Sequence, residues 1–493
     1  MKLKKIISSL LLLTFAAGLL ACANSDEGTT QQATTLAEGE SAATEGDPEN
    51  PRMAIKAELP DKDFGGREFT IIYPEWSMYG DYYFAEEEIG EAINDAIYKR
   101  TLNVEEKFNV DLKSVTFGDI NTIYPTVSKS VKAGSDDFSL ALTHCMDGVA
   151  EFATSGIAVN WNKIPYVDFS KPWWNQQMND NCSIEGVLVT AVSDYIIFDP
   201  TVIYFNKRLI EAYELENPYN LVKEGKWTWD KLAEQAKAVS LDLNGDGKFD
   251  ENDQYGLVSD TGWMLEAALQ GSEMFTVKKD DSGIPVFALS EEPRFGELLN
   301  KLYDLLFVGE QTFTDVWDPN LTTTRFESLV PMSSDRVLYH LDPLSAGKRY
   351  RTYEVEFGIL PFPKFNEDQK DYWSLSWNGF MVVPQTADLE MVGAVSEMLA
   401  AESYYHVVPA YYDILLTSKI SRDNESVEMI DIIYKGACFD FGLDFGSRNQ
   451  LCFPLTNILN SKKNEYVAFF ERSQTSFNRN MKKVYDGIVE NYS

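Results

Sequence analysis

The feature that most constrains the fold of this chain is an alternation of strand-like and helix-like segments between residues 69 and 154. The predicted order is strand 69–73, helix 91–108, strand 110–115, helix 120–133, strand 138–142 and helix 146–154. Strands that alternate with helices in this way pair in parallel, and the helices cover the faces of the sheet. We therefore expect an α/β fold, in which ligands bind beyond the carboxyl ends of the strands.

A second group of strands and helices follows the first. We expect strands at 187–190, 202–205, 357–363 and 380–383, helices at 229–239, 263–274, 294–306 and 388–402, and mostly helical structure after Tyr411. Because 493 residues exceed the usual size of one compact domain, this pattern predicts at least two lobes.

The charge balance narrows the range of partners. The chain has 77 acidic and 43 basic residues, a formal net charge of -34, and so repels the phosphates of nucleic acids. Its three histidines, His144, His340 and His406, provide little material for His-based metal centres or nucleophile–base pairs. Nucleic acid is therefore a poor partner and most hydrolase classes are disfavoured, although glycosidases, which need only carboxylates, are not.

Five cysteines are present, one of which belongs to an N-terminal signal. The other four, Cys145, Cys182, Cys438 and Cys452, have no Cys-x-x-Cys spacing and therefore no zinc pattern. Two disulfides and four buried free thiols are equally compatible with these positions.

The N-terminus has the pattern of a bacterial lipoprotein signal. Lysines at positions 2, 4 and 5 precede an apolar run over residues 6–20, which has the length of a signal peptide and is short for a membrane span. The run ends in Leu19-Leu20-Ala21-Cys22, which resembles a lipobox, where a peptidase cuts before the cysteine and its thiol receives lipid. We expect residues 1–21 to be the signal peptide and Cys22 to hold the body at the extracellular face of the cytoplasmic membrane.

The next segment, residues 22–58, has the composition of a disordered linker. Between Ala23 and Arg52 it is rich in Thr, Ala, Glu and Gly, has one leucine and contains no aromatic residue. Such a sequence buries too little apolar surface to offset the entropy of ordering. A flexible linker of this length spans about 30 Å, enough to hold a folded body just clear of a membrane.

Residues 242–253 have the pattern of a calcium-binding loop. Oxygen-bearing side chains occupy loop positions one, three, five, nine and twelve, a backbone carbonyl is available at position seven, and Gly247 stands at position six, where the loop must turn. The expected ligands are Asp242, Asn244, Asp246, Lys248 through its carbonyl, Asp250 and Asp253. Because residues 254–259 predict a strand, only the entering helix of an EF-hand is present. We expect a structural Ca²⁺ ion, with a solvated polar turn as the alternative.

An ordered set of motifs resembles a known family. The set comprises the lipobox, the linker, Asp63-Phe-Gly-Gly-x-Glu-Phe-Thr70, the helix start Trp227-Thr-Trp-Asp230, and the Asp-x-Asn-Gly-Asp-Gly loop before Tyr255-Gly256. It resembles extracellular solute-binding proteins of family 1, the ligand-capturing lipoproteins of ABC importers, which mostly take up sugars and oligosaccharides. The resemblance covers nearly the whole chain from about Leu59 onwards.

This resemblance implies a two-lobed periplasmic-binding-protein-like fold (type II), with crossover hinge strands between the lobes and a helical C-terminal part. The implied crossovers lie near residues 199–200, 373–379 and 410–416. The implied lobe 1 comprises residues 59–198 and about 378–412, and lobe 2 comprises residues 199–377 and about 413–493. The implied function is non-enzymatic capture of a carbohydrate ligand and its delivery to ABC transporter permease subunits.

The resemblance also implies a ligand-binding set in the cleft between the lobes. Sugar recognition needs carboxylates or amides for the hydroxyl groups and aromatic faces for the rings. The matching positions are Glu75, Trp76, Asp147, Asp199, Trp263, His340, Asp342, Trp377 and Asn378. Trp263 and Trp377 are equally compatible with core packing, and we interpret Trp173 and Trp174 as packing residues.

The sequence alone leaves two other functional classes of protein open. A surface-anchored, glycan-active hydrolase would use two of the many carboxylates, and an adhesin or dockerin-bearing protein would use the calcium loop. A dockerin needs two tandem loops, whereas this chain has one. Within the binding class, a non-sugar solute such as a peptide is a further alternative.

Overall fold

The computed structural model describes residues 50–75, 83–145, 148–259, 261–314, 330–350, 352–377, 379–411, 424–446 and 449–492. The chain divides into two compact units, Met1–Asp47 and Pro48–Ser493, and all described residues belong to the second. The expected signal peptide, Cys22 and most of the linker therefore lie outside the described residues. None of the described helices is both long and apolar enough to cross a lipid bilayer.

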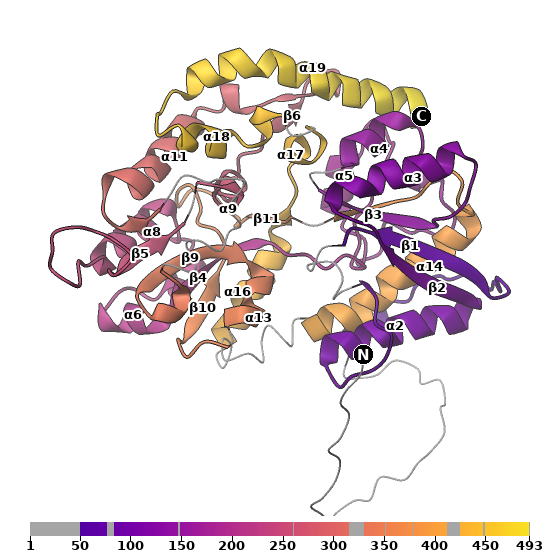
Figure 1. Ribbon diagram of the computed structural model, residues 1–493, viewed down its shortest axis with the longest axis horizontal. Helices are drawn as coiled ribbons and strands as arrows, with labels where there is room; N and C mark the ends of the chain where they lie inside the picture. Colours follow the sequence, from indigo (N-terminus) through magenta and orange to yellow (C-terminus); the bar gives the residue numbers. More distant parts are fainter. Residues whose placement is uncertain are drawn as a thin grey trace, which may run out of the picture. The chain divides into compact units, whose positions relative to one another are not determined.

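The first sheet has the strand order β12-β3-β1-β2 (Figure 1). Its parallel strands are β1 (Arg67–Tyr73), β2 (Val110–Thr116) and β3 (Leu140–His144), and β12 (Gly379–Val382) pairs antiparallel with β3. The strands that the sequence predicts around residues 69, 110 and 138 are confirmed as one parallel sheet. Their carboxyl ends lie at one edge of this sheet, where the loops after β1 and β2 meet.

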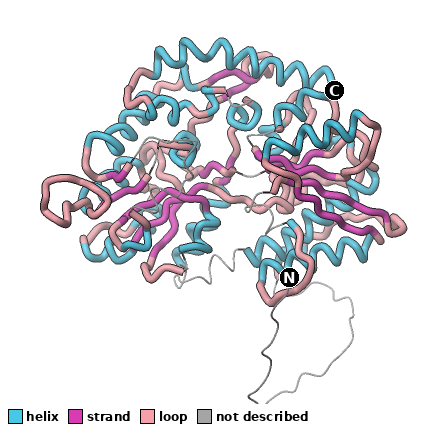
Figure 2. Tube along the Cα trace, in the orientation of Figure 1, coloured by secondary structure: helices cyan, strands magenta, loops and turns pink. Residues whose placement is uncertain are grey.

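Helices cover both faces of the first sheet. The helix α3 (Ile123–Lys132) lies on one face, and α2 (Ala92–Phe108) and α14 (Leu389–Glu402) lie on the other (Figures 1 and 2). Asp388 caps α14 because its carboxylate accepts hydrogen bonds from the N–H groups of Glu390 and Met391. Eleven of the fourteen residues of α14 are buried, so this helix belongs to the core of the molecule.

The second sheet has the order β10-β4-β9-β5-β8. Its strands are β4 (Thr201–Asn206), β5 (Tyr255–Val258), β8 (Thr312–Phe313), β9 (Val337–Pro343) and β10 (Phe357–Leu360). The strand β5 pairs in parallel with β8 and β9, whereas β4 pairs antiparallel with β9 and β10. This sheet is thus mixed, unlike the mostly parallel first sheet.

Two helices pack on strands of the second sheet. The helix α8 (Trp229–Val239) begins at Thr228, whose hydroxyl accepts a hydrogen bond from the N–H of Lys231. It lies so close to β5 that a side chain at Gly256 would meet the backbone of Ala236 at about 2.1 Å. A second helix, α16 (Asn424–Lys435), contacts β10.

The segments between the two sheets lie side by side. Pro200 and Ser376 form an antiparallel bridge, and the hydroxyl of Thr201 donates to the carbonyl of Leu375 at 3.0 Å. The short strand β11 (Ser374–Leu375) also pairs with β13 (Ala437–Cys438). The expected crossovers near 199–200 and 373–379 coincide with this region, whereas most of the third lies outside the described residues. The lobe limits themselves stay a prediction.

A long C-terminal helix, α19 (Tyr466–Tyr492), contacts two elements that lie far apart in the sequence. It packs on α4 (Val149–Ser155), which follows β3, and on β7 (Pro285–Phe287). At its end, the hydroxyl of Tyr492 donates to the carbonyl of Phe152, and the ammonium of Lys163 donates to the carbonyl of Tyr492.

Two predicted elements differ from the structure. Residues 187–190 do not form a strand, because the N–H of Leu188 donates to the side chain of Asn160 and its carbonyl accepts from the N–H of Trp161. The helix expected over residues 263–274 is divided at Ala267 into α9 (Trp263–Glu266) and α10 (Ala268–Gly271).

The end of the expected linker is packed against the folded body. Residues 51–54 form a 3₁₀ turn, and the side chain of Asn50 donates to the carbonyl of Tyr405 at 2.8 Å. The guanidinium of Arg52 lies 4.6 Å from the ring centre of Tyr404. Residues 50–58 are therefore not a free linker, because aromatic residues after α14 provide a surface on which they pack.

The four cysteines of the described residues, at positions 145, 182, 438 and 452, are thiols outside any disulfide, and all are buried. The structure thus selects one of the two alternatives that their spacing left open. Trp173 and Trp174 are confirmed as packing residues, since they are 0% and 1% exposed. Their indole N–H groups both donate to the buried carboxylate of Glu397 on α14.

Candidate functional site

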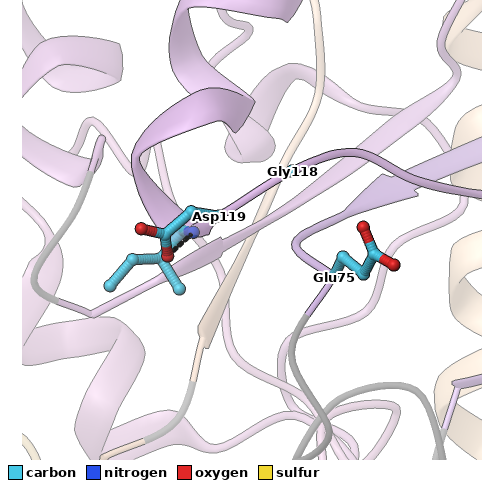
Figure 3. A pocket seen from close by; sticks show the side chains of 4 residues that line it. Glu75, Gly118 and Asp119 are labelled. Atoms are coloured by element: carbon cyan, nitrogen blue, oxygen red, sulfur yellow. Dashed lines mark hydrogen bonds between the residues drawn. The ribbon is translucent and has the colours of Figure 1, made fainter.

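A cavity of about 390 Å³ lies at the carboxyl edge of the first sheet (Figure 3). It is lined by Glu75, which follows β1, and by Gly118, Asp119 and Ile120, which follow β2. The N–H of Glu75 donates to the carbonyl of Gly118 at 2.8 Å, so the two loops are held together by backbone. Ligands bind at this edge in open α/β sheets, and the cavity has the volume of a small-molecule site.

The carboxylates of Glu75 and Asp119 are both exposed at this cavity and point in different directions (Figure 3). One oxygen of Asp119 accepts a hydrogen bond from the N–H of Ile120 and so starts the turn over residues 120–122. Carboxylates on separate loops can accept hydrogen bonds from hydroxyl groups at different positions of a ligand.

Asp119 lines this cavity but is absent from the set of ligand residues that the sequence predicts. The signal that could have found it is its place after the strand at 110–115, which corresponds to the place of Glu75 after the strand at 69–73. Of the other predicted ligand residues, Trp76, Asp147 and Asn378 lie outside the described residues. Trp263 begins α9, and only its backbone is described.

His340 and Asp342 lie on β9 and share one partner, Tyr350. The hydroxyl of Tyr350 lies 2.8 Å from Nδ1 of His340 and donates to Asp342 at 2.7 Å. Tyr350 ends the short helix α13 (Gly347–Tyr350), and the guanidinium of Arg349 in the same helix pairs with Asp342. The structure therefore brings the two predicted residues together in a network with Arg349 and Tyr350.

The protonation state of His340 follows from this environment. Burial of the imidazole, and then the charge of Arg349, lower the pKa of His340 to about 3. The ring is therefore neutral at physiological pH. With Tyr350 donating to Asp342, the ring can donate from Nδ1 to the Tyr350 oxygen. His340 is thus a neutral hydrogen-bonding group in this network.

Asp199 belongs to the same region of the second sheet. Its two carboxylate oxygens accept from the backbone N–H and the hydroxyl of Ser345, at 2.7 and 2.6 Å. The side chain holds the 3₁₀ turn Leu344–Ala346, which leads directly into α13. Asp199 is therefore placed to position Arg349 and Tyr350 through this turn.

Trp377 is 3% exposed and packs parallel to Phe453, with ring centres 6.4 Å apart and an interplanar angle of 2°. A ring packed in this way presents little surface to a ligand. The structure thus places Trp377 in the core, and its part in ligand binding stays a prediction. Glu75 and the network around Asp342 come from different sheets, and the predicted set accordingly divides into two groups.

The predicted calcium loop is closed by its own hydrogen bonds. Asp242 accepts from the N–H groups of Gly245 and Gly247 at 2.7 and 2.8 Å. Gly245 and Gly247 have backbone φ angles of 72° and 78°, which residues other than glycine rarely adopt. Asp253 is 0% exposed, and its two oxygens accept from the N–H groups of Leu243 and Asp250.

The fit of these residues to a metal ion is therefore incomplete. Across the described residues, no group of three or more His, Cys, Asp or Glu side chains is arranged to hold a metal ion. Asp242, Asp246 and Asp250 each accept a backbone N–H within the loop, so they would have to share their oxygens with the ion or turn towards it. Calcium binding stays a prediction.

No protein-family model matches the chain, and no curated protein matches it. Solved structures do match. A solute-binding protein of an ABC transporter from Thermotoga lettingae, bound to alpha-D-tagatose, superposes with a TM-score of 0.52 at 13% identity over 84% of this chain and 100% of its own. A cyclo/maltodextrin-binding protein in complex with maltotetraose gives a TM-score of 0.54 at 14% identity, covering 86% and 98% of the two chains. The fold is that of a two-lobed periplasmic binding protein.

A third solved structure agrees with this assignment. A sugar transporter protein from Rhizobium etli in an open conformation gives a TM-score of 0.55 at 14% identity, over 86% of this chain and 99% of its own. Coverage of nearly the whole length of each neighbour means that both lobes take part in the match. The predicted α/β, two-lobed fold class is therefore confirmed, while the family 1 assignment rests on the sequence motifs.

Proposed function

We propose that this protein is an extracellular, lipid-anchored solute-binding protein of an ABC importer, which captures a sugar or oligosaccharide and delivers it to a membrane permease. The observation that carries the proposal is the pair of α/β sheets joined by adjacent crossover segments, in a fold shared with structures that hold tagatose and maltotetraose. The carboxylate-lined cavity at the edge of the first sheet supports it.

In this proposal each lobe supplies one half of the recognition. Glu75 and Asp119 accept hydrogen bonds from ligand hydroxyl groups on the first lobe, since carboxylates form strong charge-assisted bonds with such donors. On the second lobe, Arg349 is the donor. Its side chain is 44% exposed and lies 5.1 Å from the ring centre of Tyr350, which keeps the guanidinium oriented. Asp199 has the supporting role of holding the turn before α13.

The mechanism is closure of one lobe on the other around the ligand. A ligand that contacts both lobes makes more contacts in the closed arrangement, and it therefore shifts the equilibrium towards closure. The crossover segments around Pro200 and Ser376 would act as the hinge, because they are short and connect the two sheets directly. No bond in the ligand is broken, in keeping with neighbours that are binding proteins.

The lipobox-like segment over residues 19–22 supports the proposed lipid anchor at Cys22. The Cys22→Ser variant should be lost from the membrane fraction while still binding ligand in solution, because the thiol is needed only for the lipid. Fractionation followed by immunoblotting measures this. Unchanged membrane retention of the variant would show that the segment 19–22 is not a lipobox.

Calcium in the loop over residues 242–253 would act as a structural ion and not in ligand capture. The ligands would be Asp242, Asn244, Asp246, Asp250, Asp253 and the carbonyl of Lys248. The loop lies between α8 and β5, so an ion there would tie the end of a helix to a strand of the second sheet.

The experiment that tests the proposed function is a thermal-shift screen of the mature protein against a panel of oligosaccharides, followed by calorimetry of each ligand found. A ligand that binds only the native state raises the unfolding temperature. The double variant Glu75→Gln and Asp119→Asn should weaken binding by about ten-fold or more, the effect of losing charge-assisted hydrogen bonds. Glu490→Gln, an exposed change on α19, is the matched control.

Recovery of the ligand after incubation separates this proposal from a glycan-active enzyme. A binding protein returns the oligosaccharide intact, whereas a hydrolase releases shorter products. Chromatography of the recovered sugar decides between them. Release of products by the parent protein, or binding to peptides and to no saccharide in the panel, would contradict the proposal.

A further inference from the structure

A second cavity, of about 440 Å³, shares no lining residue with the cavity at Glu75. It is lined by α5 (Gln176–Cys182), by the hairpin of β6 (Val277–Lys279) and β7, and by residues near β11 and α17 (Phe441–Phe445). Figure 1 shows α5, β6 and α17 next to one another, near α19. Its volume falls within the range of small-molecule sites.

The cavity has an aromatic wall that is open to a ligand. Phe275, Trp373 and Phe441 line it, and all three are only partly buried. Phe275 and Trp373 meet edge to face, with ring centres 6.0 Å apart and an angle of 88°. Five other tryptophans of the described residues are fully buried, so the partial exposure of Trp373 is unusual for this chain.

One buried carboxylate holds together the two segments that carry this wall. Asp440 is 0% exposed and accepts from the N–H and the hydroxyl of Thr276 and from the N–H of Gly442. The residues on either side of Thr276 and of Asp440 are the cavity-lining Phe275, Val277, Phe439 and Phe441. The contact between Asp440 and Thr276 therefore fixes two pairs of apolar side chains on one wall.

The cavity lining also has a polar part. Gln177 and Asn181 are exposed and stand four residues apart on α5, so their amides lie on the same face of that helix. Lys279 also lines the cavity, and its ammonium donates to the carbonyl of Ser183 at 3.0 Å. Amides both donate and accept hydrogen bonds, as sugar hydroxyl groups do.

We infer that this cavity is a second carbohydrate-binding site, which holds a short saccharide between α5 and the aromatic wall. The C–H-rich face of a pyranose packs on aromatic rings, and its hydroxyl groups pair with planar amides. A purely apolar ligand would offer no hydrogen-bond partner to the amides of Gln177 and Asn181. The inference rests on the proposed function only for the choice of ligand class.

The test uses the mature protein labelled with fluorotryptophan and observed by ¹⁹F NMR. The resonance of Trp373 is assigned from the Trp373→Phe variant. Maltotetraose, cellotetraose and xylotetraose are added to about 10 mM, which detects dissociation constants in the millimolar range. At least one of them should shift the Trp373 resonance saturably.

Two sets of variants locate the binding. Gln177→Ala with Asn181→Ala should weaken the titration of Trp373 by about five-fold, the effect of a lost neutral hydrogen bond. Gln176→Ala with Asp180→Ala, two exposed changes on the same helix outside the cavity lining, should leave it unchanged. The cleft variant Glu75→Gln with Asp119→Asn should also leave the midpoint at Trp373 unchanged.

Each outcome decides the inference. Absence of any Trp373 shift overturns it, and so does a shift that the cleft variant abolishes, because that shift would report binding in the cleft. Equal titrations of the cavity variant and its helix control overturn it as well. Failure of the proposed function is distinct from these results, since then Trp373 alone would respond and the cleft variant would have no effect on any saccharide titration.

Discussion

Asp199 holds two hydrogen bonds to Ser345 at the start of the turn that leads to Arg349 and Tyr350. The Asp199→Ala variant should lower the free energy of unfolding by about 1–3 kcal/mol, because the N–H and the hydroxyl of Ser345 lose their acceptor. It should also weaken ligand binding by displacing Arg349. Urea denaturation and calorimetry measure the two effects.

Ser345→Ala is the matched control for this prediction. It removes the hydroxyl bond and keeps the bond from the backbone N–H, so its effects should be smaller than those of Asp199→Ala. A variant at Asp199 that matched the parent in both stability and affinity would contradict the positioning role.

Glu266 gives a prediction about pH. Its buried carboxylate accepts from the N–H groups of Leu455 and Thr456 and from the hydroxyl of Thr456. Burial outweighs these bonds and raises the pKa of Glu266 from 4.5 to about 8. The native state therefore binds this proton more tightly than the unfolded state, and the contribution to stability is lost as the pH rises through about 8.

Glu266→Gln should remove this part of the pH dependence. Between about pH 5 and 8, the free energy of unfolding of the parent should fall more steeply with pH than that of the variant. The exposed change Glu297→Gln on the helix over residues 294–303 serves as the control. Parallel curves for the parent and Glu266→Gln would show that the carboxyl titrates alike in both states.

Single residues were predictable from sequence where a local rule applied. Trp173 and Trp174, which follow Lys171-Pro172, were correctly assigned to packing. Asp119 was missed, although the rule that identified Glu75 applies to it. The engagement of Asp199 by Ser345 was not predictable, because it joins positions 146 residues apart through a tertiary contact.

At the scale of elements, the calcium loop has the sharpest test. If the loop over residues 242–253 binds Ca²⁺, a chelator should lower the unfolding temperature of the parent, because an ion bound only to the native state stabilises by up to a few kcal/mol. The Asp246→Ala variant should show no such loss, whereas the exposed hairpin variant Asp281→Ala should behave as the parent does. Calorimetric unfolding with and without chelator makes the comparison.

An unchanged unfolding temperature of the parent on chelation would mean that the loop is held by its own hydrogen bonds. The structure offers a physical reason for that outcome, because both carboxylate oxygens of Asp253 already accept hydrogen bonds, from the N–H groups of Leu243 and Asp250. Ligand affinity should be unaffected in either case, because the loop does not line the cavity at Glu75.

Elements with a strong period or a clear alternation were predicted well, as α2, α14 and the three parallel strands show. The strand predicted over residues 187–190 is wrong. Its apolar run is typical of a strand, but the N–H and the carbonyl of Leu188 are hydrogen-bonded to Asn160 and Trp161 and not to a neighbouring strand. A side-chain acceptor from a distant segment leaves no signal in the local sequence. The break of the expected helix at Ala267 likewise has no local helix-breaking residue to mark it.

At the scale of the molecule, two lobes were predictable from length, from alternating elements and from the family resemblance. The role of α19 was not, because its contacts with both α4 and β7 depend on tertiary packing. On the predicted lobe limits, α4 belongs to lobe 1 and β7 to lobe 2, so α19 would connect the lobes by a route separate from the crossovers around Pro200 and Ser376. On those limits, the proposed closure would have to keep the contacts of α19 with both α4 and β7, or exchange one of them for another contact.

Closure itself is tested by small-angle scattering of the mature protein with and without a saturating saccharide. The radius of gyration should decrease on binding, because a ligand with contacts on both lobes favours the closed arrangement. In the Glu75→Gln and Asp119→Asn variant, the first lobe lacks its acceptors, and the same saccharide concentration should produce a smaller decrease. Glu490→Gln should behave as the parent does. A radius that stays constant while calorimetry shows saturation would mean that the ligand binds without moving the lobes, and that α19 and the crossovers together hold one arrangement.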